Sequence, residues 1–288
     1  MREPGAAISY RLGMVRLLFC LGSLILAALP TQAEDRRVPT DQRDYTDSIN
    51  GCAPASVLNL LKFSDPGSGY AAVYDSLIGT GESVKMRYLV DRYFKGRASG
   101  TYPGRKRWGI HGVDCSDLVL GLNEMLGEKD LRPLNGAYLD RGPGENGAEH
   151  LRRCREQIES SLRDGVTPLL SLRSFVVKRR GKRENEPAWE SAVHHYVLVT
   201  GLHDSGSPFG LDLEIIDPWQ GRHTRIHLHR ESHGQVFRAL RGVEESGEWL
   251  AGTPFLQVLA PEVETLRPGD LKWHERFIVI ANFLITSP

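Results

Sequence analysis

Cys52 stands where the sequence changes from a loop to a helix. Pro54 fits the first turn of a helix, where its missing N–H costs nothing. Apolar residues then recur at helical spacing, which predicts a buried helix: Val57, Leu58, Leu60 and Leu61. The positive end of a helix dipole favours a thiolate, which is the nucleophilic form of cysteine. Cys52 is therefore a candidate nucleophile, although a buried structural cysteine or a disulfide would give the same pattern.

The second half of the chain contains a histidine and an aspartate in predicted strands, which could serve as the base and as the acceptor that orients it. His195 opens an apolar run of strand length, and Asp217 ends the next such run. Residues 204–210 form a turn between the runs, so adjacent antiparallel strands would bring the two side chains together. A nucleophilic thiol needs a base that takes its proton and an acceptor that orients the base. His194 would point to the opposite face of the strand from His195.

The elements that position these residues follow from the hydrophobic spacing. Helices are expected at residues 70–94, 114–126 and 148–163, after the helix that starts at Cys52. Strands are expected later, at residues 167–172, 195–201, 211–216, 222–229, 255–259 and 277–285. Helices first and strands second predict a segregated α+β domain.

Four short blocks, at residues 50–56, 158–168, 195–201 and 216–219, occur in an order that resembles the papain-like cysteine peptidases, most closely the C39-like peptidases. The resemblance implies a papain-like α+β fold, with N-terminal helices packed on a C-terminal antiparallel sheet. It implies that Cys52 is the nucleophile, that His195 is general base and acid, and that Asp217 orients the imidazole. It also implies an oxyanion-stabilising amide upstream of the cysteine, either Gln42 or Asn50. The family's glycine after the cysteine is Ala53 here.

Cys115 is a rival nucleophile. Residues 108–119, around Asp114, Cys115 and Ser116, resemble the nucleophile block of cell-wall peptidases of the NlpC/P60 type, which also place a cysteine at a helix start. The glycine that this group has after the serine is Asp117 here, and no histidine-led strand follows at the group's short distance. The sequence therefore favours Cys52 over Cys115.

The N-terminus predicts an export signal. Arg11 and Arg16 precede an apolar run at residues 17–29, and small residues follow up to Ala33. We expect a signal peptide at residues 1–33, cleavage near Ala33, and a secreted or periplasmic peptidase domain at residues 34–288 with no integral membrane span. An uncleaved anchor is the alternative. If Cys52 is the nucleophile, Cys115 and Cys154 are the pair left for a disulfide.

The charge composition limits the classes of binding partner that the sequence suggests. The chain has 288 residues, with 36 Lys and Arg against 36 Asp and Glu, and the scattered basic residues give no indication of nucleic-acid binding. His227, His229 and Glu231 alternate on one predicted strand face that could hold a metal, with His223 or His233 nearby, but a solvated polar face is commoner. We expect a cysteine peptidase or amidase that cleaves a peptide or protein substrate through a thioester, with no cofactor or metal. An acyltransferase and a catalytically silent binding protein remain alternatives.

Overall fold

The computed structural model describes residues 38–178, 188–206, 209–230, 255–267, 269 and 277–288. By compactness the chain divides into Met1–Val38 and Pro39–Pro288, and the fold and site below belong to the second unit. The predicted signal peptide lies outside the described residues.

The described residues contain five α-helices and two sheets. The helices are α3 (Cys52–Phe63), α4 (Tyr70–Ser76), α5 (Glu82–Leu89), α6 (Cys115–Gly127) and α7 (Gly147–Arg163). The strands are β1 (Trp108–Gly109), β2 (Gly112–Val113), β3 (Asn135–Tyr138), β4 (Leu169–Lys178), β5 (Ala188–His203), β6 (Gly210–Asp217), β7 (Arg222–His229), β8 (Leu256–Leu259) and β9 (Phe277–Thr286). Short helical turns include η1 (Gln42–Asp44), η2 (Ser48–Asn50), η4 (Val90–Phe94) and η5 (Trp219–Gly221).

The large sheet closes on itself. Its strand order is β3-β9-β4-β5-β6-β7-β8, all antiparallel, and β8 also pairs with β9 through Leu256↔Ala281 and Gln257↔Ile280. Six strands therefore form a closed barrel, and β3 adds to β9 beside it. β1 and β2 form a separate small hairpin.

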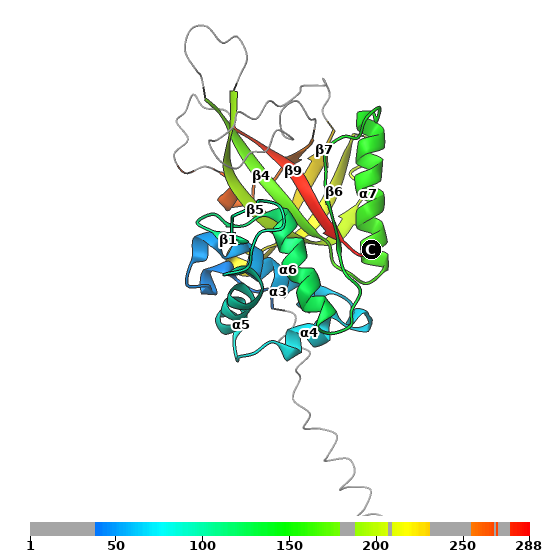
Figure 1. Ribbon diagram of the computed structural model, residues 1–288. Helices are drawn as coiled ribbons and strands as arrows, with labels where there is room; N and C mark the ends of the chain where they lie inside the picture. Colours follow the sequence, from blue (N-terminus) through cyan, green and yellow to red (C-terminus); the bar gives the residue numbers. More distant parts are fainter. Residues whose placement is uncertain (1–37, 179–187, 207–208, 231–254, 268, 270–276) are drawn as a thin grey trace, which may run out of the picture. The chain divides into compact units, whose positions relative to one another are not determined.

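The papain-like arrangement expected from the sequence is therefore wrong. In an open sheet of this strand order β8 would be an edge strand, whereas here it also pairs with β9. Figure 1 shows α3, α4, α5 and α6 gathered at one end of the barrel and α7 running alongside it. The chain thus combines a closed barrel with a helical layer at its end.

Apolar residues form two main clusters that match this arrangement. Alternate residues of all six barrel strands gather in one cluster with Leu151, Cys154 and Ile158 of α7. The other cluster joins α3, α5 and α6 to the opposite strand faces, through residues such as Leu198 and Ile216. Successive residues of a strand point to opposite faces, so neighbouring residues such as Val197 and Leu198 belong to different clusters.

The helix expected at residues 70–94 is broken. It divides into α4, α5 and the wider turn η4, because the intervening segment contains Gly79 and Gly81 with φ values of 109° and 96°. Such positive φ values are not helical, and glycine adopts them readily. The sequence pattern located the apolar stripe but not this interruption.

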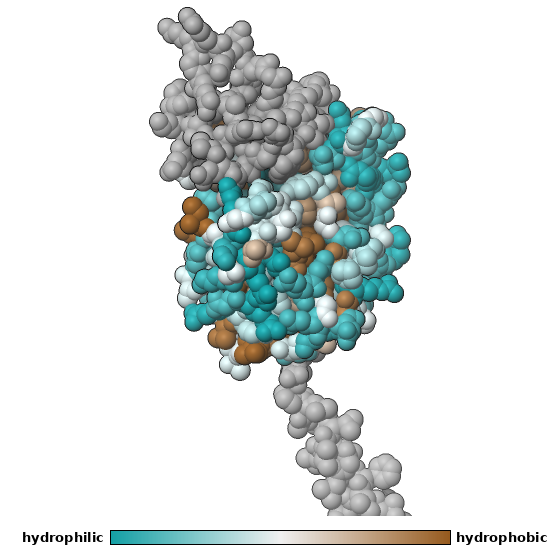
Figure 2. Space-filling view, in the orientation of Figure 1, coloured by the Kyte–Doolittle hydropathy of each residue, from teal (hydrophilic) through white to brown (hydrophobic). Residues whose placement is uncertain are grey.

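The described surface is largely polar on the face shown in Figure 2, with hydrophobic residues in smaller patches. Within the part of the chain that the structure describes, no helix has the length and apolar character needed to cross a membrane.

Candidate active site

α3 begins at Cys52 and is anchored on β5. Gly51 is its N-cap, and the apolar residues expected to face the core, from Val57 to Leu61, are all buried. The hydroxyl of Ser56 donates to the backbone oxygen of Tyr196 at 3.0 Å, one residue beyond His195. The N-terminal part of α3, which carries the candidate nucleophile, is therefore fixed against the strand that carries the candidate base.

His195 and Asp217 lie side by side, as the strand order predicted. β5 and β6 pair with Leu198 opposite Ile216, and His195 Nε2 lies 2.8 Å from Asp217 Oδ1. The same carboxylate oxygen accepts the backbone N–H of Trp219 at 2.9 Å. His195 is 2% exposed and Asp217 is fully buried. The carboxylate thus fixes one ring nitrogen and leaves Nδ1 of His195 for another partner.

Cys52 also interacts with the His195 ring. Burial by itself lowers the pKa of His195, but hydrogen bonds from its ring to Asp217 and Cys52, together with their charges, raise the pKa to about 9. An imidazole with this pKa is protonated at neutral pH, and an imidazolium beside a sulfur stabilises a thiolate. The structure therefore brings Cys52, His195 and Asp217 together as one chain of contacts.

The raised pKa of His195 makes the protein's stability pH-dependent. Because the folded-state value of about 9 exceeds the usual 6.5, this group stabilises the fold fully below pH 6.5, and the contribution is lost as pH rises through 9. The shift corresponds to about 3 kcal/mol. Denaturant unfolding at pH 6 and pH 9.5 should show this loss in the wild type and a smaller one in His195→Gln. An equal loss in both proteins would contradict it.

The two candidate oxyanion donors lie in different surroundings. Gln42, in η1, is 3% exposed, and its backbone N–H donates to the oxygen of Pro218 at 2.8 Å, directly after Asp217. The side-chain amide of Asn50 donates to Asp47 Oδ2 at 2.8 Å and to the backbone oxygen of Ile110 at 3.3 Å. These contacts use both hydrogens of the Asn50 amide, so Asn50 would have to give up a loop contact to act as an oxyanion donor.

A second cysteine–histidine contact lies elsewhere in the core. Cys115 begins α6 after the N-cap Asp114, and its Sγ lies 3.4 Å from His194 Nε2, 3.4 Å from the Tyr196 hydroxyl and 3.5 Å from Ser171 Oγ. Ser171 Oγ lies 2.6 Å from the same ring nitrogen. The two adjacent histidines of β5 therefore each contact a different cysteine.

The charge states of the two pairs differ. Burial, followed by the charge of Asp114, raises the pKa of Cys115 to about 11. Burial, followed by the charge of Arg173, holds the pKa of His194 well below its usual value. The Cys115 pair is therefore a neutral thiol beside a neutral imidazole, whereas the Asp217 carboxylate favours a charged His195.

The sequence reasoning missed this second cluster. The signals were present as two adjacent histidines and a cysteine after a capping aspartate, but Ser171 and Asn282, which is bonded to Ser171 at 2.7 Å, come from strands far apart in the chain. Only the register of β4, β5 and β9 brings them together.

The disulfide considered for Cys115 and Cys154 is not formed in the structure. Cys52, Cys115 and Cys154 are all buried free thiols. Cys115 belongs to the cluster at the helical end, and Cys154 of α7 belongs to the barrel cluster. Burial raises the pKa of Cys154 to about 12, so its thiol stays protonated at neutral pH.

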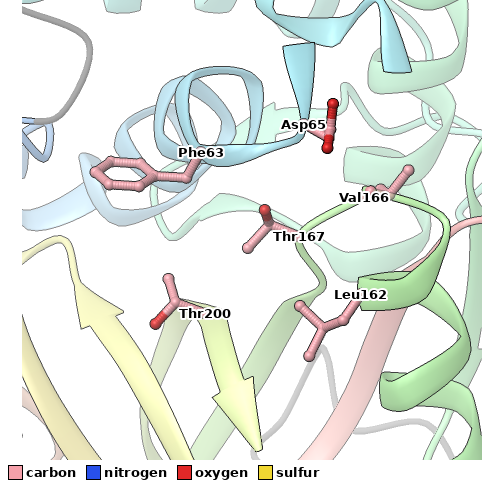
Figure 3. A pocket seen from close by; sticks show the side chains of 7 residues that line it. Phe63, Asp65, Leu162, Val166, Thr167 and Thr200 are labelled. Carbon is pink, nitrogen blue, oxygen red and sulfur yellow. The ribbon is translucent and has the colours of Figure 1, made fainter. Parts of the chain in front are cut away.

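The structure also contains a pocket at the end of α3, and β7 carries the histidines considered as metal ligands. The pocket, of about 350 Å³, lies at the C-terminal end of α3 between Phe63, Thr167 and Thr200 (Figure 3). Phe63, which lines the pocket, lies about 16 Å from Cys52 along the axis of α3. Among the described residues, no three His, Cys, Asp or Glu side chains form a group suited to a metal, and His227 Nδ1 instead lies 2.6 Å from Asp212 Oδ1.

Comparisons of the chain with protein-family models, curated proteins and solved structures found no match.

Proposed function

We propose that this protein is a cysteine peptidase or amidase that cleaves a peptide or related amide bond with Cys52 as nucleophile. The contact chain from Cys52 through His195 to Asp217, with the pKa of His195 raised to about 9, carries the proposal. The relation to C39-like peptidases rests on the four sequence blocks and does not include the papain-like arrangement. Export followed by cleavage near Ala33 is part of the proposal, resting on the N-terminal sequence pattern.

The proposed reaction proceeds through a thioester. The Cys52 thiolate attacks the carbonyl carbon, and the resulting oxyanion accepts hydrogen bonds from the Gln42 amide and from a backbone N–H at the start of α3. His195 donates its proton to the leaving amine as the C–N bond breaks, which leaves the acyl group on sulfur. His195 then takes a proton from water as the water oxygen attacks the thioester carbon. The C–S bond breaks, the carboxylic acid leaves, and the Cys52 thiolate beside protonated His195 is restored. Asp217 holds the ring in orientation throughout.

The test is alkylation of the unreduced protein, residues 34–288, with iodoacetamide at mildly acid pH, mapped by mass spectrometry. We expect fast labelling of Cys52 alone. Replacement of His195 by Ala should slow it by on the order of 100-fold, because general acid–base partners contribute about that much or more. The matched control is His194→Ala on the adjacent strand position, which should leave Cys52 labelling unchanged.

One specific observation supports a second candidate. The 3.4 Å contact between Cys115 Sγ and His194 Nε2 would suit a cell-wall peptidase of the NlpC/P60 type. Labelling of Cys115 that depends on His194, with Cys52 unlabelled, would replace the first proposal with this one.

A further inference from the structure

The segment at residues 39–45, here called the strap, is held to α3 by a two-bond clamp. The backbone N–H of Thr40 donates to Asn59 Oδ1 at 2.6 Å, and Asn59 Nδ2 donates to the backbone oxygen of Thr40 at 3.2 Å. Thr40 and Asn59 are both fully buried. One side chain of α3 therefore satisfies both backbone groups of Thr40, two residues before Gln42.

A partly buried ion pair adds to this clamp. Lys62, whose side chain is 1% exposed, donates to Glu82 Oε1 at 2.9 Å and to the Thr40 hydroxyl at 3.3 Å. The Thr40 hydroxyl donates in turn to Glu82 Oε2 at 2.8 Å, and the Tyr74 hydroxyl donates to Glu82 Oε1 at 2.6 Å. Loss of Glu82 would leave the buried Lys62 ammonium without its carboxylate partner, which is costly, so the network holds the strap in one position.

The strap is also bonded to the turn that follows Asp217. The backbone N–H of Gln42 donates to Pro218 O at 2.8 Å, and the N–H of Gln220 donates to Asp41 Oδ1 at 3.1 Å. Gly221, at φ 58°, approaches so closely that a Cβ there would lie 2.9 Å from the backbone oxygen of Pro39. The strap therefore joins the helix that starts at Cys52 to the turn that starts at Asp217.

We propose that Asn59, Lys62 and Glu82 are positioning residues that act through the strap to place Gln42 as the oxyanion donor. The inference rests on the proposed function. Asn59 and Lys62 are three residues apart and share one face of α3. The same rigid helix then carries the nucleophile at its start and the clamp for the oxyanion donor further along. A shift of about 1 Å in such a donor costs up to about 100-fold in rate.

Two reactions of Cys52 distinguish a role in oxyanion stabilisation from a general effect on the stability of the fold. Alkylation by iodoacetamide needs the thiolate but forms no oxyanion, whereas acylation by 4-nitrophenyl acetate passes through a tetrahedral oxyanion. We expect Asn59→Leu to slow acylation at least about 10-fold, since a lost oxyanion donor costs about 100-fold or more. Alkylation should stay within about twofold of wild type, because Asn59 does not touch the Cys52–His195 pair.

Asn123 provides a matched control. Its Nδ2 donates to Leu134 O at 2.9 Å and its Oδ1 accepts the Leu134 N–H at 2.7 Å, which is the same clamp placed on α6. Asn123→Leu should leave both reactions of Cys52 unchanged. If Asn59→Leu does not fold, Thr40→Val, which keeps the backbone clamp, should still slow acylation a few-fold through loss of its hydroxyl bonds.

A double-mutant cycle decides whether Asn59 acts through Gln42. If it does, Asn59→Leu should slow acylation no further in a Gln42→Ala background. Additive effects, or equal losses of alkylation and acylation in Asn59→Leu, would overturn the inference. Unchanged acylation in Gln42→Ala, with normal labelling of Cys52, would overturn it and leave the proposed function standing. If Cys52 of the wild type is not labelled at all, the proposed function fails and this inference with it.

Discussion

Replacing Cys52 with Ser should abolish turnover of an activated ester, whereas the same substitution at Cys115 should leave turnover within about threefold of wild type. Serine is nearly isosteric with cysteine, but its hydroxyl is a far weaker nucleophile in a site that stabilises a thiolate. Loss of the nucleophile of a hydrolase costs on the order of 1,000-fold or more. Turnover is measured as release of 4-nitrophenol above the uncatalysed background.

Cys115→Ser is a stringent control because Cys115 also starts a buried helix beside a histidine. A serine there can replace the thiol in its contacts with Ser171 and Tyr196, so the fold should be kept. The opposite result, with activity lost in Cys115→Ser and retained in Cys52→Ser, would assign the chemistry to the second pair.

The local part of the site could be predicted from the sequence. Apolar residues at helical spacing after Cys52 are enough to indicate a buried helix with the thiol at its start, and α3 runs from Cys52 to Phe63. The approach of His195 to Asp217 required only that two consecutive strands be antiparallel neighbours, as β5 and β6 are. Both inferences depend on short-range periodicity and on the commonest strand connection.

The closure of the sheet could not be predicted in this way. Alternating burial reveals which residues of a strand face the core, but an edge strand and a barrel strand share the same pattern. The bonds of Leu256 and Gln257 in β8 to β9 decide the architecture, and they join strands on either side of the segment 260–276. The same limitation applied to the cluster around Cys115 and His194, which depends on the register of three strands.

Replacing Asp217 with Asn should remove most of the reactivity of Cys52 at mildly acid pH. The amide oxygen can still accept from His195 and Trp219, so the geometry is largely kept, but the negative charge is lost. The charge and hydrogen bond of Asp217, together with the contact with Cys52, raise the pKa of His195 to about 9 against the effect of burial. Without the contributions of Asp217, burial opposes only the contact with Cys52, so the pKa of the imidazole falls from its raised value.

The measurement is the rate of Cys52 alkylation between pH 5 and pH 9. In Asp217→Asn the rate at pH 6 should fall by on the order of 100-fold, because the neutral imidazole no longer stabilises the thiolate, and the loss should narrow as pH rises. The decline in stability between pH 6.5 and pH 9 should also shrink, because it depends on the raised pKa of His195.

The matched control uses another histidine–aspartate contact of the same chain. Asp212 Oδ1 lies 2.6 Å from His227 Nδ1 on the strands β6 and β7, so Asp212→Asn changes the same kind of pair without touching Cys52. Its alkylation profile should match wild type. If Asp217→Asn also matches wild type across this pH range, the carboxylate does not set the charge of His195, and Cys52 must draw its reactivity from the helix alone.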